Sequence, residues 1–150
     1  MYLVSACLAG INCRYDGKNS IVSEIEELIR NGKAIAICPE LLGGLTIPRD
    51  SCEIVKASEG NLKVMSKDGK DLTAAFEEGA QKTLKIAQTI GISAAILKSR
   101  SPSCGYGKVY DGTFTKTLKD GNGFTASLLA ANGITVYTDE EFETTFKGGK

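Results

Sequence analysis

Residues 20–38, SIVSEIEELIRNGKAIAIC, indicate the fold class of this 150-residue chain. In the first half of this stretch, apolar residues recur at helical spacing, at Ile21, Ile25, Leu28 and Ile29. Asn19 or Ser20 is suited to cap such a helix, and Asn31-Gly32 is suited to end it. The apolar run Lys33–Cys38 then has the length and continuity of a buried strand. A helix that leads directly into a buried strand is typical of βαβ units with parallel strands.

The alternation of strands and helices extends along the rest of the chain. Further strands are predicted at Tyr2–Ala6, Ala94–Leu97 and Ile134–Tyr137, with a hairpin of Glu53–Ala57 and Leu62–Ser66. Helices are predicted from the cap Asp71 to Gly91, at Phe124–Ala131, and in a short tail with Phe142 and Phe146. We therefore expect an α/β fold: a Rossmann-like, mostly parallel sheet flanked by helices, with a β-hairpin insertion. No linker or repeat divides it, so residues 1–150 are expected to form a single domain.

The composition favours a globular protein with a small-molecule ligand. Apolar residues make up 42% of the chain, and 18 basic residues balance 18 acidic ones. No basic cluster indicates nucleic-acid binding, and no apolar run reaches the roughly 18 residues of a membrane span. Histidine is absent, which excludes histidine bases and imidazole metal ligands. Five cysteines without a secretory signal favour free thiols in a reducing compartment, so we expect a cytoplasmic protein.

Three of the cysteines follow predicted strands. Cys7 comes after the first strand, Cys38 ends the second, and Cys104 lies in the loop that leaves the third. The carboxyl ends of parallel strands meet at one edge of a sheet, so we expect these thiols to share one crevice. The spacing matches no standard zinc or ferredoxin motif, so the prediction depends on this convergence. Cys13 and Cys52 lie further from the strand ends, and we expect no ligand role for either.

Polar residues beside these thiols are candidates for chemistry and for substrate binding. Glu40, two residues after Cys38, is either a solvated surface carboxylate or an acid/base group. Arg14 and Arg49 are either surface charges or donors to a polar substrate. Ser101 and Ser103 place two hydroxyls next to Cys104. Two aspartates, Asp16 and Asp111, precede glycines and are expected to form turns.

The motifs around these residues resemble those of the TudS-like thiouracil desulfidase family. The resemblance is carried by SACL at residues 5–8, RYDG at 14–17, CPE at 38–40, GGL at 43–45, PR at 48–49, LK at 97–98, SPSCG at 101–105 and YDGTF at 110–114. These motifs occur in order over nearly the whole chain. One departure is Cys13, where the family pattern has an apolar residue; it is either a spare thiol or a fourth ligand.

The resemblance implies a [4Fe-4S] cluster held by Cys7, Cys38 and Cys104, with Glu40 and Ser101 as the catalytic carboxylate and hydroxyl. The expected reaction converts a thiolated nucleobase into its carbonyl counterpart and releases sulfide without a net redox change. The substrate partner is then a small molecule, and the cluster is expected to be lost readily from protein prepared in air. Two alternatives stay open: a zinc–thiolate hydrolase that uses the same cysteines, and a metal or redox sensor without catalysis.

Overall fold

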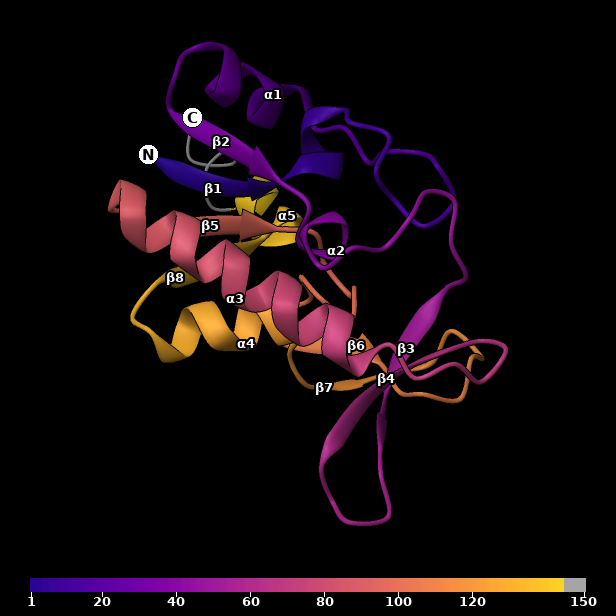
Figure 1. Ribbon diagram of the computed structural model, residues 1–150. Helices are drawn as coiled ribbons and strands as arrows, with labels where there is room; N and C mark the ends of the chain where they lie inside the picture. Colours follow the sequence, from indigo (N-terminus) through magenta and orange to yellow (C-terminus); the bar gives the residue numbers. More distant parts are fainter. Residues whose placement is uncertain (145–150) are drawn as a thin grey trace.

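The core of the protein is a four-stranded parallel sheet with the order β2-β1-β5-β8. We describe residues 1–144 of a computed structural model (Figure 1). The strands are β1 (Tyr2–Ser5), β2 (Ala34–Ile37), β5 (Ala94–Leu97) and β8 (Thr135–Thr138). Tyr2 is in register with both Ala34 and Ala94, so β1, β2 and β5 end at the same level. The predicted mostly parallel sheet is confirmed.

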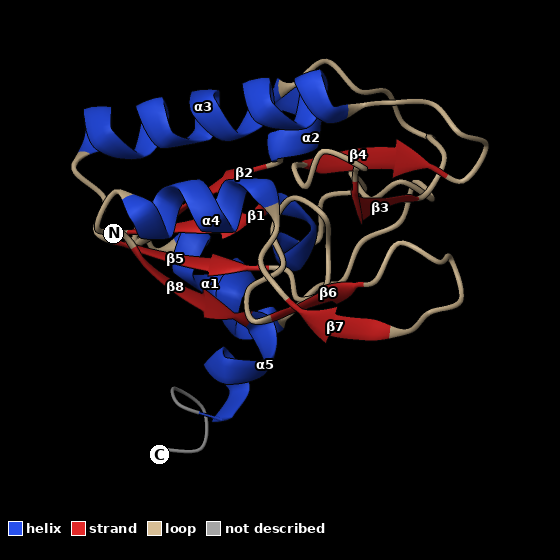
Figure 2. Ribbon diagram, turned by 90° about the horizontal axis from the view of Figure 1, so that it is seen from below, coloured by secondary structure: helices blue, strands red, loops and turns tan. Residues whose placement is uncertain are grey.

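Helices cover both faces of this sheet, which explains why its strands are apolar throughout. On one face, α3 (Thr73–Ile90) and α4 (Phe124–Ala131) pack over β1 and β5, as Figure 2 shows. On the other face lie α1 (Ser23–Arg30) and α5 (Asp139–Phe142). Neighbouring residues of β1 point to opposite faces: Leu3 packs in the α3–α4 layer and Val4 in the α1–α5 layer, and both are fully buried.

Two antiparallel pairs extend the molecule beyond the ends of the parallel strands. β3 (Cys52–Lys56) and β4 (Leu62–Ser66) form the predicted hairpin, which packs against α3 through Ile54, Val64 and Phe76. The second pair, β6 (Lys108–Tyr110) with β7 (Leu118–Asp120), was not predicted. Each of its strands has only three residues, too few for an alternating pattern to stand out.

The ends of several predicted elements are displaced in the structure. The α1 helix begins at Ser23 after an N-cap at Val22, while the Asn19 side chain accepts from Ile21 N–H in a turn before the helix. Leu72 rather than Asp71 is the N-cap of α3, although Asp71 still accepts from the backbone N–H and the hydroxyl of Thr73. The side chains of Asn19 and Asp71 thus accept hydrogen bonds at the starts of these helices without being their N-caps.

The predicted strand ends are also adjusted. Ala6 belongs to the 3₁₀ helix η1 (Ala6–Ala9), and β8 begins one residue later than expected. Phe142 ends α5, whereas the expected contribution of Phe146 lies outside the described residues. No helix within residues 1–144 has the length and apolar character needed to cross a membrane.

The short helix α2 (Pro39–Leu42) packs unusually close to α3, at a pair of glycines. A Cβ on Gly79 would lie 2.0 Å from the carbonyl oxygen of Pro39, and one on Gly43 would lie 2.0 Å from that of Ala75. Only glycine permits this backbone approach. The contact places the first turn of α2, which carries Glu40, at the carboxyl ends of the parallel strands.

Candidate active site

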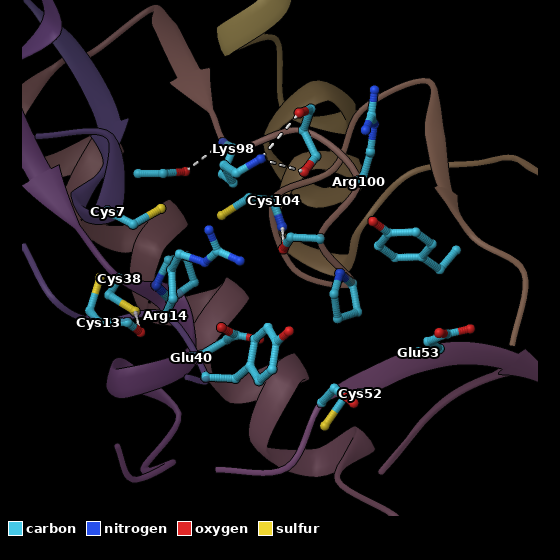
Figure 3. A pocket seen from close by; sticks show the side chains of 18 of the residues that line it. Cys7, Cys13, Arg14, Cys38, Glu40, Cys52, Glu53, Lys98, Arg100 and Cys104 are labelled. Carbon is cyan, nitrogen blue, oxygen red and sulfur yellow. Dashed lines mark hydrogen bonds between the residues drawn. The ribbon is translucent and has the colours of Figure 1, made fainter. Parts of the chain in front are cut away.

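A cavity of about 360 Å³ lies at the carboxyl ends of β1, β2 and β5. This is the edge where ligands bind in open parallel sheets, and the volume is in the usual range of roughly 300–1,000 Å³ for small-molecule sites. Its lining includes the three cysteines predicted from strand position, Cys7, Cys38 and Cys104, together with Cys13 and Cys52. Figure 3 shows the first three and Cys13 grouped together, with Cys52 apart from them.

Each predicted thiol reaches the cavity from the residue or loop that follows a strand. Cys7 lies in η1, directly after β1, and Cys38 is the N-cap of α2, directly after β2. Cys104 belongs to the loop after β5. Because the three strands end at one level, residues far apart in the sequence meet here, as the strand-end argument predicted.

The Cys104 side chain is buried and is surrounded by hydroxyls. Burial raises the pKa of its thiol to about 12, against hydrogen bonds from the side chains of Ser5 and Ser103 that lower it. The Ser5 hydroxyl oxygen also accepts from the backbone N–H of Lys98 at 2.9 Å, which ties the end of β1 to the end of β5.

Cys13 lies with these thiols, although it is further from the strand ends along the sequence. It is only 2% exposed and belongs to the buried cluster that contains Cys7 and against which Cys38 packs. The contact with Cys38 lowers the Cys13 pKa, but the contact with Cys7 and burial outweigh it and raise that pKa to about 11. The hydrogen bond with Cys13, together with burial, raises the pKa of Cys38. Residues 10–20 form a loop whose path cannot be predicted from the pattern of strands and helices. This loop brings Cys13 back to the ends of the strands.

Cys52 lines the outer part of the cavity, at the start of β3. Burial raises the pKa of its thiol to about 11, and its sulfur hydrogen-bonds to the carbonyl oxygen of Asp50 at 3.5 Å. Its partners therefore differ from those of the other four cysteines.

Glu40 lines the cavity and is oriented by Arg49. The guanidinium forms an ion pair with Glu40 Oε2 and also donates to the carbonyl oxygens of Cys13 at 3.0 Å and Thr46 at 3.1 Å. With a side chain 7% exposed, Arg49 is absent from the cavity lining. The structure thus places Arg49 behind Glu40, in contact with that carboxylate and with two backbone carbonyl oxygens. The other carboxylate oxygen, Oε1, remains for a ligand or a water molecule.

Ser101 lines the cavity beside Cys104 and accepts two backbone hydrogen bonds. Its hydroxyl oxygen accepts from the N–H groups of Ser103 at 3.0 Å and Cys104 at 2.8 Å. Because both lone pairs are used, the O–H is left as a donor. The side chain is thereby prepared to donate a hydrogen bond or a proton.

The other two residues predicted to bind substrate differ in position. Arg14 lines the cavity, where its guanidinium donates to the Ser20 hydroxyl at 2.9 Å and lies 3.6 Å from Asp16. Ser103 does not line the cavity: it is 1% exposed and hydrogen-bonds to the Thr125 hydroxyl at 2.8 Å. The structure thus gives Ser103 contacts with Thr125 and Cys104 in place of a substrate contact.

Both predicted turn-forming aspartates form turns. Asp16 accepts from the backbone N–H of Lys18, and Asp111 accepts from the backbone N–H and hydroxyl of Thr113. The hydrogen bonds from Thr113 lower the pKa of Asp111. Neither aspartate is among the residues that line the cavity.

The sequence of this chain matches the family model described as 2-thiouracil desulfurase over residues 2–141. That span contains every residue of the cavity.

The chain belongs to the 2-thiouracil desulfurase family.

Two known proteins are similar to this chain over nearly its whole length. The uncharacterized protein YbbK of Bacillus subtilis (strain 168) is 44% identical over 146 residues, which cover 94% of this chain and 97% of that protein. A solved structure, the [4Fe-4S]-dependent thiouracil desulfidase TudS, superposes with a TM-score of 0.86 at 37% identity, covering 98% of this chain and 95% of that chain. The resemblance recognised from the motifs is therefore confirmed, and the chain is an enzyme of the desulfidase type.

The cavity lining is also rich in basic residues, of which the sequence pattern had indicated only Arg14. Five basic residues line it, namely Arg14, Lys67, Lys98, Arg100 and Lys116, against three acidic ones, Glu40, Asp50 and Glu53. Lys98 directly follows β5, so the strand-end argument applied to cysteines would have found it. Glu53 is buried and accepts from the backbone N–H groups of Gly112 and Phe114, which holds the loop between β6 and β7 against the cavity.

Proposed function

We propose that this enzyme removes sulfur from a thiolated, uracil-like nucleobase and uses a [4Fe-4S] cluster held by Cys7, Cys38 and Cys104. One observation carries the proposal: the three thiols, the Glu40 carboxylate and the Ser101 hydroxyl line the same cavity. The family and the TudS neighbour support the same reaction class.

The donor set suits an iron–sulfur cluster. Thiolates are the soft ligands that such clusters take, and three separate segments supply one each.

Three protein ligands leave one iron of a four-iron cluster for substrate. When bound, the cluster supplies a soft Lewis acid that attracts a thiocarbonyl sulfur and polarises the carbon–sulfur bond. The residues of the chain must then provide water activation and a proton.

Glu40 activates water. Arg49 holds Glu40 Oε2, so Oε1 takes a proton from a water molecule as its oxygen attacks the thiocarbonyl carbon. The ion pair orients the carboxylate at no entropic cost during the reaction, because both side chains are already held in the fold. Without Arg49 the carboxylate would lose this orientation.

Ser101 supplies a proton to the ring nitrogen or the departing sulfur. Its oxygen already accepts two N–H bonds, which favours donation of the O–H. The Ser101 oxygen then regains a proton from solvent or from Glu40. In sum, a thiocarbonyl and water give a carbonyl and hydrogen sulfide; carbon–sulfur bonds break, carbon–oxygen bonds form, and no electron acceptor is needed.

The test is anaerobic purification, iron and sulfide analysis, and incubation with 2-thiouracil and 4-thiouracil. We expect close to four irons per chain, a brown colour, and release of sulfide with formation of uracil. Colourless protein containing zinc would favour the hydrolase alternative. A loaded cluster with no turnover of either base would favour a sensor.

A further inference from the structure

Cys13 lies where it can contact two of the three proposed cluster ligands. Cys13 and Cys7 belong to one buried cluster against which Cys38 packs, and the Cys38 thiol donates to the Cys13 carbonyl oxygen at 3.9 Å. Figure 3 shows Cys13 beside Cys38 and on the same side of the cavity. One part of the site therefore has three thiols for two ligand positions.

Cys104 has a different set of neighbours. The hydrogen-bond partners of its sulfur are the hydroxyls of Ser5 and Ser103. A hydroxyl is a harder and less acidic donor than a thiol, and it is a poorer ligand for the iron of such a cluster. The extra thiol thus serves the positions of Cys7 and Cys38 and not that of Cys104.

The backbone of Cys13 is held in place by two hydrogen bonds. Its carbonyl oxygen accepts from Arg49, and its N–H donates to the carbonyl oxygen of Ile11. Because Cys13 packs beside Cys7 and Cys38 and lines the same cavity, its thiol lies next to the positions that these two ligands would occupy.

We propose that Cys13 is an exchangeable iron ligand that replaces Cys7 or Cys38 when either one is lost. The inference rests on the proposed [4Fe-4S] function. In the exchange, the Cys13 thiol gives up its proton and forms an iron–sulfur bond, while the bond to the departing ligand breaks and that sulfur takes up a proton. No electrons are transferred, so no oxidant is required. Such a spare ligand would keep the cluster when a neighbouring thiol is oxidised.

The experiment compares cluster content in single and double variants. Cys7→Ala, Cys38→Ala and Cys104→Ala are prepared with and without Cys13→Ala, reconstituted anaerobically with iron and sulfide, and analysed for both elements and for visible absorbance. Cys7→Ala and Cys38→Ala are expected to keep at least half of the wild-type cluster, and to lose it at least tenfold once Cys13→Ala is added. Cys104→Ala is expected to be empty in either background, and Cys13→Ala alone to stay loaded.

Cys52→Ala is the matched control in place of Cys13→Ala, and it is expected to leave the Cys38→Ala cluster unchanged. Circular dichroism checks that each chain is folded. The inference is overturned if Cys7→Ala and Cys38→Ala are both as empty as Cys104→Ala while the wild type is loaded, or if their clusters survive Cys13→Ala. A wild-type chain that takes up no cluster would instead overturn the proposed function.

Discussion

The glycine contact between α2 and α3 makes Gly79→Ala a test of how α2 positions the active site. The added Cβ would lie 2.0 Å from the carbonyl oxygen of Pro39, whereas such contacts are essentially never under 3.0 Å. The backbones of α2 and α3 must therefore separate by about 1 Å, because neither contacting atom belongs to a flexible side chain. Glu40 follows Pro39 directly and moves with it.

The expected effect of Gly79→Ala on stability combines two opposing contributions, and its effect on rate follows from the displacement of Glu40. Overpacking costs about 1–3 kcal/mol, while alanine in place of glycine within a helix gains about 1 kcal/mol, so we expect a net loss of roughly 0–2 kcal/mol. A displacement of about 1 Å at a catalytic group costs on the order of a hundredfold in rate. A hundredfold loss of rate corresponds to about 2.7 kcal/mol of activation free energy, so the loss in turnover per cluster should exceed the loss of stability.

The assay measures sulfide release per bound cluster, with urea denaturation in parallel. Gln88→Ala, at an exposed position of the same helix, is the control and should change neither quantity by much. Wild-type turnover in Gly79→Ala, together with a gain of stability, would refute the reasoning, since the helix would then have accommodated the methyl group without moving Glu40.

Three further predictions concern individual side chains. Glu40→Gln should lower turnover by about a hundred- to ten-thousandfold with unchanged iron content, because the amide cannot accept the proton from water; full activity would remove Glu40 from the mechanism. Ser101→Ala should lower turnover less if water replaces the hydroxyl, and a loss of cluster would instead mark Ser101 as a structural support of the Cys104 loop. In the cluster-free chain, folding raises the Cys104 pKa from 9.0 to about 12, so the stability it contributes is full below pH 9 and is lost as the pH rises toward 12. Urea denaturation between pH 9 and 12 should show that the free energy of unfolding falls less steeply with pH in Cys104→Ala than in the wild type. The same pH dependence in both proteins would contradict the raised pKa of Cys104.

Local patterns in the sequence determined most of the fold. Apolar runs and helical periodicity indicated the four parallel strands and the long helices, because burial of both sheet faces leaves a continuous apolar signal in each strand. The same patterns placed Cys7, Cys38 and Cys104 after strands. Since parallel strands end at one edge, the convergence of these thiols could be predicted from their positions alone.

Contacts between distant segments decided the rest, because they leave no periodic signal along the chain. The place of Cys13 depends on how the turn after η1 folds back, and the role of Arg49 depends on its burial against Glu40 and the Cys13 carbonyl. The close approach of α2 and α3 likewise requires Gly79 to meet a backbone carbonyl about forty residues away, and no local rule predicts that contact. Sequence alone thus determined that Cys7, Cys38 and Cys104 meet at the sheet edge, whereas the tertiary structure decided that Cys13 joins them and which side chains surround and orient them.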